Sequence, residues 1–147
     1  GVWKTVYTGK NRPYKLKKLK SGKEYSFRVR ALRLDGKRKV YSSWEYIYTA
    51  TKPKTPAKFS VKTNSKHQII ARWSKVKACS GYQVQYAKDK SFKKKIATRD
   101  VAKGKKSYTG KNFTKGNTYY VRIRTYVVSG DKRIYSPWTA AKIIKSK

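Results

Sequence analysis

Cysteine and histidine are nearly absent from this chain of 147 residues, which contains one of each, Cys79 and His67. A single cysteine excludes an internal disulfide and any zinc site built from several cysteines. The sequence also lacks a glycine-rich phosphate loop and a Gly-x-Ser-x-Gly stretch, which are typical of nucleotide-binding proteins and serine hydrolases. We therefore expect no metal, no cofactor and no catalytic residue.

Acidic residues are scarce too, because six Asp and Glu stand against 40 Lys and Arg. The six are Glu24, Asp35, Glu45, Asp89, Asp100 and Asp131. No two of them are spaced as an acid and base couple, so we predict that the chain is not an enzyme. A nucleophile pair of Cys79 and His67 is the one catalytic alternative. Cys79 precedes an expected strand, where its simpler role is that of a small, partly buried side chain.

The same imbalance leaves a formal net charge of +34. At most six basic side chains can find an acidic partner within the chain, so the rest face solvent or an external anion. Such a surface attracts phosphate polymers, acidic glycans or nucleic acid, and the attraction weakens as salt rises. No apolar run approaches the roughly 20 residues of a membrane helix, so we expect no membrane insertion. The sequence that starts at Gly1 does not have the pattern of a secretion signal peptide, and this says nothing about a longer parent chain.

Aromatic and β-branched residues are plentiful, with 13 Tyr, four Trp and four Phe, and these residues favour strands. Short runs alternate in polarity: Tyr119, Val121 and Ile123 point one way, while Arg122 and Arg124 point the other. "QIIARW" (68–73) and "GYQVQY" (81–86) alternate in the same way. No segment has the pattern of an amphipathic helix. The sequence therefore predicts an all-β, antiparallel sandwich.

One stretch of the sequence occurs in two similar copies. Sliding the sequence by 94 residues aligns 22–44 with 116–138 without a gap and gives eight identities in 23 positions. The identical pairs are Gly22 and Gly116, Tyr25 and Tyr119, Arg28 and Arg122, Arg30 and Arg124, Gly36 and Gly130, Tyr41 and Tyr135, Ser42 and Ser136, and Trp44 and Trp138. This spacing is too long for a solenoid repeat and indicates tandem domains.

From Pro56 to Lys147 the chain resembles a complete fibronectin type III domain. The resemblance rests on the proline before "AKFSVK", on Trp73, on "GYQVQY", and on "KGNTYYVRIR" (115–124) as the sixth strand, F. The family's tyrosine-corner pattern is met by Phe113, Gly116 and Tyr119, and again by Leu19, Gly22 and Tyr25. "YSSWE" and "YSPWT" are similar to the Ser-x-Trp motif of cytokine-receptor-type members. The lysine content resembles modules of secreted Gram-positive bacterial proteins, which implies an extracellular or cell-wall location.

Residues 1–52 match only the second half of such a domain, about strands C′, E, F and G. They have no counterpart of the Trp73 strand or of "GYQVQY". Half a sandwich cannot bury its own inner face, so we expect this half to be completed by missing residues, by strands of another chain or by self-association. Residues 53–147 are the expected complete domain, and 51–56 ("TKPKTP") form the link.

Two sets of candidate site residues follow. The first is a face of arginine and tryptophan on strands F and G: Arg28, Arg30, Trp44, Arg122, Arg124 and Trp138. It is either a ligand platform or, as we favour, a structural cation–π ladder. The second is a set of lysine clusters: Lys17, Lys18 and Lys20; Lys93, Lys94 and Lys95; and Lys103, Lys105 and Lys106. These bind polyanions, or they are solvated loops that block sheet aggregation.

Three functions remain open. We prefer a non-catalytic spacer and adhesion module of a larger surface or secreted protein, next to other domains of its parent and in contact with anionic cell-wall polymer. The second is a glycan-binding adhesin whose Tyr108, Tyr120 and Tyr126 stack on sugar rings. The third, nucleic-acid binding, has the charge and the aromatic residues but none of the usual modules, so we consider it unlikely.

Overall fold

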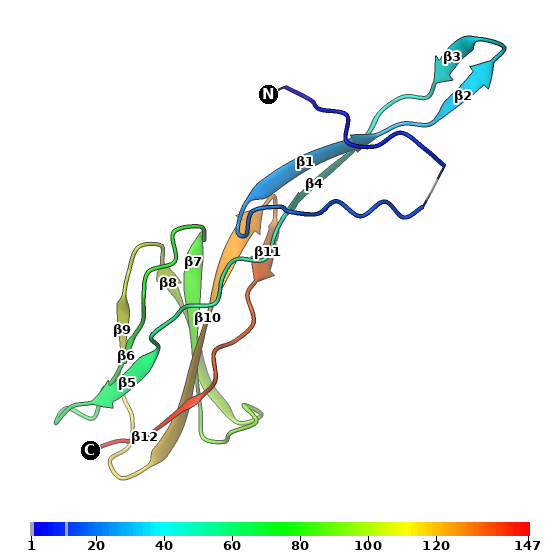
Figure 1. Ribbon diagram of the computed structural model, residues 1–147. Helices are drawn as coiled ribbons and strands as arrows, with labels where there is room; N and C mark the ends of the chain where they lie inside the picture. Colours follow the sequence, from blue (N-terminus) through cyan, green and yellow to red (C-terminus); the bar gives the residue numbers. More distant parts are fainter. Residues whose placement is uncertain (1, 11) are drawn as a thin grey trace.

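The computed structural model describes residues 2–10 and 12–147, with the side chains of all of these except Lys95 and Ile96. All the regular structure of this part is β-strand (Figure 1). The strands are β1 (Glu24–Val29), β2 (Leu32–Asp35), β3 (Arg38–Tyr41), β4 (Glu45–Ala50), β5 (Ser60–Thr63), β6 (Ile69–Arg72), β7 (Gly81–Ala87), β8 (Lys95–Ala102), β9 (Ser107–Gly110), β10 (Thr118–Ser129), β11 (Lys132–Tyr135) and β12 (Lys142–Lys145).

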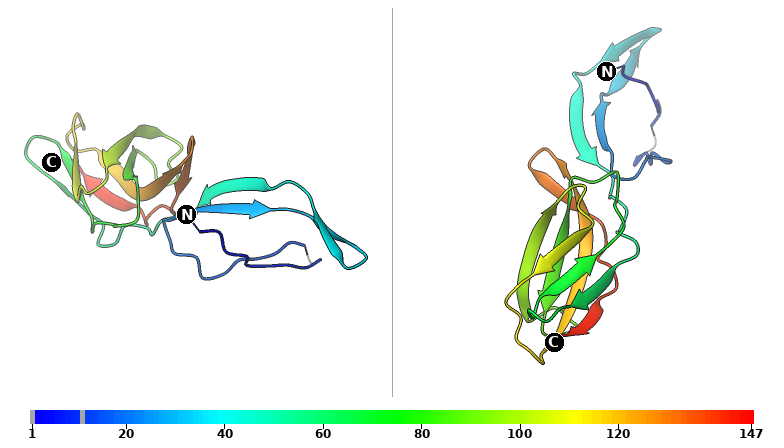
Figure 2. Two further views of the ribbon diagram at one scale, coloured as in Figure 1. Left: turned by 90° about the horizontal axis from the view of Figure 1, so that it is seen from above. Right: turned by 90° about the vertical axis from the view of Figure 1, so that its left-hand side faces the viewer.

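The strands from β5 onward form a sandwich of two antiparallel sheets. One sheet has the order β5-β6-β9, and the other has the order β11-β10-β7-β8, with β12 also paired to β10. Figure 2 shows the two layers facing each other. The predicted all-β antiparallel sandwich is thus confirmed.

The core lies between these two sheets, and most of it consists of the alternating apolar residues of 69–73, 82–86 and 119–123 that the sequence predicted. It is formed by Ile69, Ala71, Trp73, Cys79, Tyr82, Val84, Tyr86, Val101, Phe113, Tyr119, Val121 and Ile123. Aromatic rings join the layers, because Trp73 packs on Tyr82 at a centroid distance of 5.2 Å and Phe113 lies 4.9 Å from the ring of Tyr119. Full burial of such side chains stabilises the fold by roughly 1.5 to 3 kcal/mol each.

The first 52 residues form two separate two-stranded ladders, β1 with β4 and β2 with β3. None of the described residues before Pro53 is buried. The expected strands C′ and E are absent from residues 2–10 and 12–23, so that expectation was wrong. At the offset of 94 these residues correspond to β8 and β9, which pair with β7 and β6. Because the first unit has no counterpart of β6 or β7, the segment has no ladder to join.

Local details repeat between the two units. The expected tyrosine corner occurs twice: the Thr114 N–H donates to the Tyr119 hydroxyl at 2.9 Å, and the Lys20 N–H donates to Tyr25 at 2.8 Å. One difference is register, because Tyr25 lies opposite Thr49 whereas Tyr119 lies opposite Ile144, which corresponds to residue 50. The β1–β4 pair therefore has the same tyrosine corner as the β10–β12 pair, but its pairing register differs by one residue.

The link between the units is packed against the sandwich. Pro53 and Pro56 are buried, and the Thr125 hydroxyl of β10 donates to the Lys54 carbonyl at 2.7 Å. Gly22 lies directly against Ala78, since a Cβ added at Gly22 would stand 2.1 Å from the Ala78 carbonyl oxygen. The φ of +66° at Gly22 also favours glycine. The junction is therefore a close contact.

Candidate functional site

The outer face of the larger sheet carries a ladder of arginine and aromatic side chains. Arg122 and Arg124 point outward from β10 because they alternate with its buried residues. Trp138 follows β11 and lies beneath both guanidinium groups, whose Cζ atoms are 4.5 and 4.2 Å from the ring centroid. Arg122 also stacks on Phe92 at 3.8 Å, and Arg124 on Tyr135 at 3.6 Å. Each guanidinium is held between two aromatic rings.

The first unit builds the same ladder from the matching residues. Arg28 and Arg30 lie over Trp44 at 4.2 and 4.3 Å, and Arg30 also lies over Tyr41 at 3.6 Å. Trp3 covers the other side of Arg28 at 4.5 Å. The sequence analysis missed these outer rings, although the identity of Tyr41 with Tyr135 pointed to one of them. Trp3 and Phe92 are distant in sequence from their arginines, and no short-range pattern identifies them.

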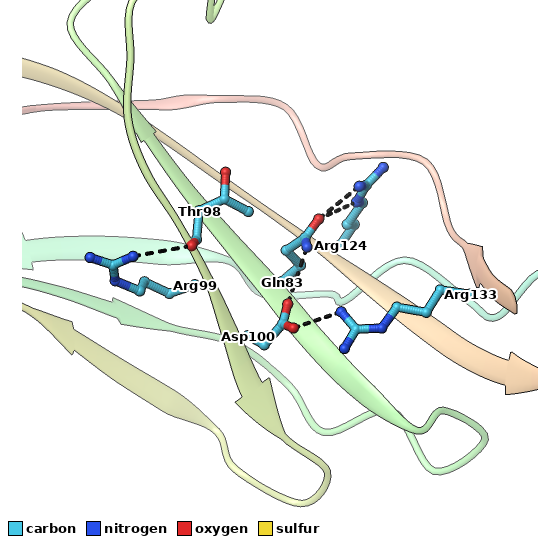
Figure 3. A network of polar contacts seen from close by, with 6 residues as sticks. All are labelled: Gln83, Thr98, Arg99, Asp100, Arg124 and Arg133. Carbon is cyan, nitrogen blue, oxygen red and sulfur yellow. Dashed lines mark hydrogen bonds and ion pairs between the residues drawn. The ribbon is translucent and has the colours of Figure 1, made fainter. Parts of the chain in front are cut away.

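Polar contacts anchor the ladder of the second unit to the strands beside it. Gln83 of β7 accepts from Arg124 Nε and Nη2 at 3.0 and 2.7 Å and donates to Asp100 Oδ1 at 3.1 Å (Figure 3). Asp100 Oδ2 accepts from Arg133 Nη1 at 2.6 Å. On the neighbouring pair, Arg122 Nε donates to Gln85 Oε1 at 2.8 Å. These bonds account for the burial of two glutamines on an outer face.

Burial and hydrogen bonding shift the pKa values of this network. Partial burial disfavours the Asp100 carboxylate, but hydrogen bonds from Arg133 and Gln83 outweigh it and hold the pKa of Asp100 below its ordinary value. Burial lowers the pKa of Arg122 and of Arg124. Both arginines stay charged at neutral pH because their ordinary pKa is so high. Two aromatic rings and one glutamine contact each guanidinium and leave little of it for a ligand, which favours a structural role for this ladder.

The lysine clusters of the second unit lie at opposite ends of the sandwich. The register of β7 with β8 pairs Ala87 with Lys95 and Gly81 with Ala102. Lys93 and Lys94 therefore lie at one end of this strand pair, and Lys103, Lys105 and Lys106 follow its other end. All five side chains are exposed. The side chain of Lys95 lies outside the described residues.

The remaining cluster, Lys17, Lys18 and Lys20, lies in the extended segment before β1, and all three side chains are exposed. Lys18 adopts a φ of +61°, like Asn112 at the matching position of the second unit (+64°). The structure therefore does not bring the three clusters into one patch.

A basic hollow that the sequence analysis did not identify lies where the two units meet. It has a volume of about 260 Å³, and Lys23, Lys77 and Lys103 line it beside a single carboxylate, Glu24. These lysines come from three separate parts of the chain. Only Lys103 belongs to an expected cluster, and no sequence signal places the other two beside it.

The three tyrosines of the glycan hypothesis do not share a platform. Tyr120 and Tyr126 lie on β10 opposite Ala87 and Gly81, and six residues of strand separate them by roughly 20 Å. Tyr108 belongs to β9 of the other sheet and packs toward Tyr86, with ring centroids 6.5 Å apart. Each of the three rings packs in different surroundings, so these tyrosines form no row of rings for a sugar chain.

Catalytic and metal-binding arrangements are not seen in the part of the chain that the structure describes. There, no three side chains of His, Cys, Asp or Glu come together. His67 Nδ1 contacts the Lys147 carbonyl oxygen. Cys79 is buried, its Sγ donates to the Val76 carbonyl at 3.2 Å, and burial raises the pKa of its thiol. The described residues also include no helix of the length and apolarity needed to cross a membrane.

Comparison with known proteins agrees with this architecture. The FN1–FN3 domains of chicken CNTN1 match with a TM-score of 0.58 at 23% identity, and the match covers 83% of this chain and 43% of that one. The fn3 domain of human contactin 1 matches at 0.53 and 20% identity, covering 64% and 77%. An Fn3-like protein from Clostridium thermocellum matches at 0.50 and 20%, covering 63% and 92%. No curated protein matches the sequence.

This chain thus spans less than half the length of the chicken FN1–FN3 chain, and the identities support a shared fold alone. A model of the fibronectin type III domain matches residues 54–142, which is the segment that folds into the two-layered sandwich with its tyrosine corner. The chain belongs to the fibronectin type III domain family.

Proposed function

We propose that the chain is a non-catalytic spacer and adhesion module of a larger extracellular protein of a Gram-positive bacterium, held by its basic surface against anionic cell-wall polymer. Fibronectin type III domains are typically structural or adhesion modules without catalysis. The observation that carries the proposal is uncompensated charge. The formal net charge is +34, and the described residues contain one ion pair, Arg133 with Asp100.

Two of the three carboxylates of the second unit are already bound within the fold, and the third, Asp131, is exposed. Asp100 is held by Arg133, and Asp89 accepts hydrogen bonds from the backbone N–H groups of Lys93 and Lys94 within its own loop. Among the described residues, none of the lysines around them forms an ion pair. Their counter-charge must therefore come from outside, as small ions or as a polymer that releases those ions when it binds.

Protection against aggregation does not account for where these lysines lie. A lysine protects a sheet when it stands on an exposed edge strand. The clusters at 93–94 and 103–106 instead occupy the turns at the two ends of β7 and β8. Turns present no unpaired ladder, so positive charge there is better explained by contact with an anion.

The position of the charge suggests how a polymer would bind. The cluster at 103–106 adjoins the basic hollow, where Lys23, Lys77 and Lys103 converge. The cluster at 93–94 lies at the far end of the strand pair, roughly 20 Å away along a seven-residue strand. A long anionic polymer could contact both ends of one domain. A short anion would bind at the hollow alone.

The test measures binding of the full chain to purified Gram-positive cell walls at physiological salt, before and after removal of their anionic polymers. We expect binding that disappears on removal and a binding constant that falls linearly in log–log plots against salt. Replacing Lys23, Lys77 and Lys103 together by glutamine should reduce both the affinity and the salt slope. The matched control replaces three exposed lysines elsewhere, Lys62, Lys142 and Lys145, and removes the same charge.

Three results would contradict the proposal. Equal binding to intact and stripped walls would point to glycan recognition. Tighter binding to DNA than to wall polymer of equal charge would point to nucleic acid. If neither wall preparation is bound at physiological salt, the chain is a passive spacer. Equal losses of affinity in the two triple variants would mean that the chain binds the polymer, but that the hollow is not the centre of binding.

A further inference from the structure

The β1–β4 ladder has a free edge that is occupied in the second unit. At the offset of 94, residues 26–32 correspond to residues 120–126 of β10, which pair with β7. Among the described residues, β1 pairs with β4 alone. The chain before β1 loops beside this ladder without joining it (Figure 2). The backbone N–H and C=O groups on the free edge of β1 are thus available to another strand.

The inner face of β1 is uncovered as well. Val29 is 58% exposed, whereas its counterpart Ile123 is fully buried. Ile47 of β4 lies opposite Phe27, on the same face, and is 54% exposed. An apolar strand face in this state favours contact with a partner.

The arginines identify what kind of strand fits this edge. In the second unit, Arg122 and Arg124 lie directly opposite Gln85 and Gln83 of β7 and donate hydrogen bonds to them. Arg28 and Arg30 hold the same stacked positions over Trp44. Within the residues that the structure describes, neither has an acceptor for its guanidinium N–H groups. Two stacked, oriented donors are therefore in place without their acceptors.

We propose that the free edge of β1 binds an extended polypeptide strand, antiparallel to residues 26–32, with the side-chain pattern of β7. One face of that strand carries two acceptors two residues apart, Gln, Glu or Asp, opposite Arg28 and Arg30. Its other face carries apolar or aromatic side chains that cover Phe27 and Val29. Backbone bonds supply the affinity and the two acceptors set the register, as in other cases of strand addition.

The occupant is a strand from outside residues 1–147 that carries this acceptor pattern, rather than a strand of a second copy. The segment of this chain with the required pattern is β7, which is buried along its whole length between β8 and β10. A second copy could donate it only by unfolding its own core. The inference goes beyond the proposed function, because it holds or fails whether or not the lysines bind a polymer.

The test uses the full chain and a fluorescent peptide of residues 80–88, "SGYQVQYAK". A second peptide carries Glu at both Gln positions. A third has the same composition but exchanges the residues at positions 84 and 85, so that its two glutamines are adjacent, lie on opposite faces and cannot both lie opposite the arginines in any register. Fluorescence anisotropy measures binding, and amide hydrogen exchange locates it. We expect the first two peptides to bind and to protect amides within residues 26–32, and the third to do neither.

Replacing Arg28 and Arg30 together by glutamine should weaken binding about tenfold or more, because hydrogen bonds from two charged donors are lost. The matched control replaces Arg33 and Arg38 by glutamine, which removes the same charge from exposed positions on β2 and β3. A loss in the first variant and not in the second supports strand addition at the β1 edge.

Other outcomes overturn the inference. Equal binding of the exchanged peptide would show that peptide composition or charge, rather than the pattern of its side chains, is responsible for binding. No protection at residues 26–32 would place any binding elsewhere. Protection that grows with the concentration of the chain alone, together with a dimeric mass, would make a second copy the occupant.

Discussion

Truncating one side chain at the same place in each unit tests how differently the two units are packed. Val29 and Ile123 occupy matching positions, yet the first is 58% exposed and the second is 0% exposed. Shortening a buried isoleucine to alanine costs roughly 2 to 5 kcal/mol, through lost transfer energy and the cavity that remains. An exposed substitution changes stability by no more than about 0.5 kcal/mol.

We therefore expect Ile123→Ala to remove a large part of the 5 to 15 kcal/mol or so that is typical of the unfolding free energy of such a domain. Because that variant risks not folding, Ile123→Val is measured beside it, with an expected loss of about 0.5 to 1.5 kcal/mol. For a domain of this size, each kcal/mol lowers Tm by roughly 4 to 8 °C. Val29→Ala should leave the main unfolding transition unchanged.

Urea and thermal unfolding, followed by tryptophan fluorescence and circular dichroism, provide the measurement. A loss for Val29→Ala as large as that for Ile123→Ala would refute the reasoning, because it would mean that the inner face of the first unit is covered in solution. Repeating the series over a range of protein concentrations separates coverage within one chain from coverage by association.

Three further predictions concern single side chains. Tyr119→Phe removes the hydroxyl that accepts from the Thr114 N–H and should lower the free energy of unfolding by about 1 kcal/mol. Tyr86→Phe removes a buried hydroxyl that has no partner among the described residues, so it should cost less or stabilise the fold. Urea unfolding of both variants measures the difference. Because the pKa of Asp100 is lowered in the fold, its carboxylate stabilises the fold at pH values above the ordinary carboxyl pKa, and this stabilisation is lost as pH falls through the lowered pKa. Asp100→Asn should therefore make the free energy of unfolding less dependent on pH in the acid range. Because burial raises the pKa of the Cys79 thiol, iodoacetamide should label Cys79 slowly at neutral pH and rapidly in urea.

The sequence alone predicted the sandwich because the alternation of polarity is clear in β7 and β10, the two central strands of the larger sheet. Tyr119, Val121 and Ile123 are buried as that pattern requires. The same pattern in the first unit did not predict exposure, because alternation tells which face of a strand is apolar and not whether a second layer covers it. Phe27 and Val29 illustrate this limit.

The candidate site was predictable only in part, and for a similar reason. The tandem copies revealed the arginines and tryptophans, since those residues recur at one offset. The two glutamines of β7 were not predicted because they reach the arginines through strand pairing, and Phe92 was not predicted because it reaches Arg122 from the loop between β7 and β8. The convergence of Lys23 and Lys77 with Lys103 depends on how two units meet, which no local pattern encodes.

The close approach of Gly22 to Ala78 gives the chain a mechanical property. With no side chain at Gly22, the corner of the first unit rests on the Ala78 carbonyl, while Thr125 holds the linker at Lys54. Such a joint holds the two units in a fixed orientation, so that a force on one unit is transmitted to the other. Gly22→Ala should force the joint open and let the units tumble independently, which NMR relaxation would detect. The close junction between the two units thus depends on the absence of a single methyl group at Gly22.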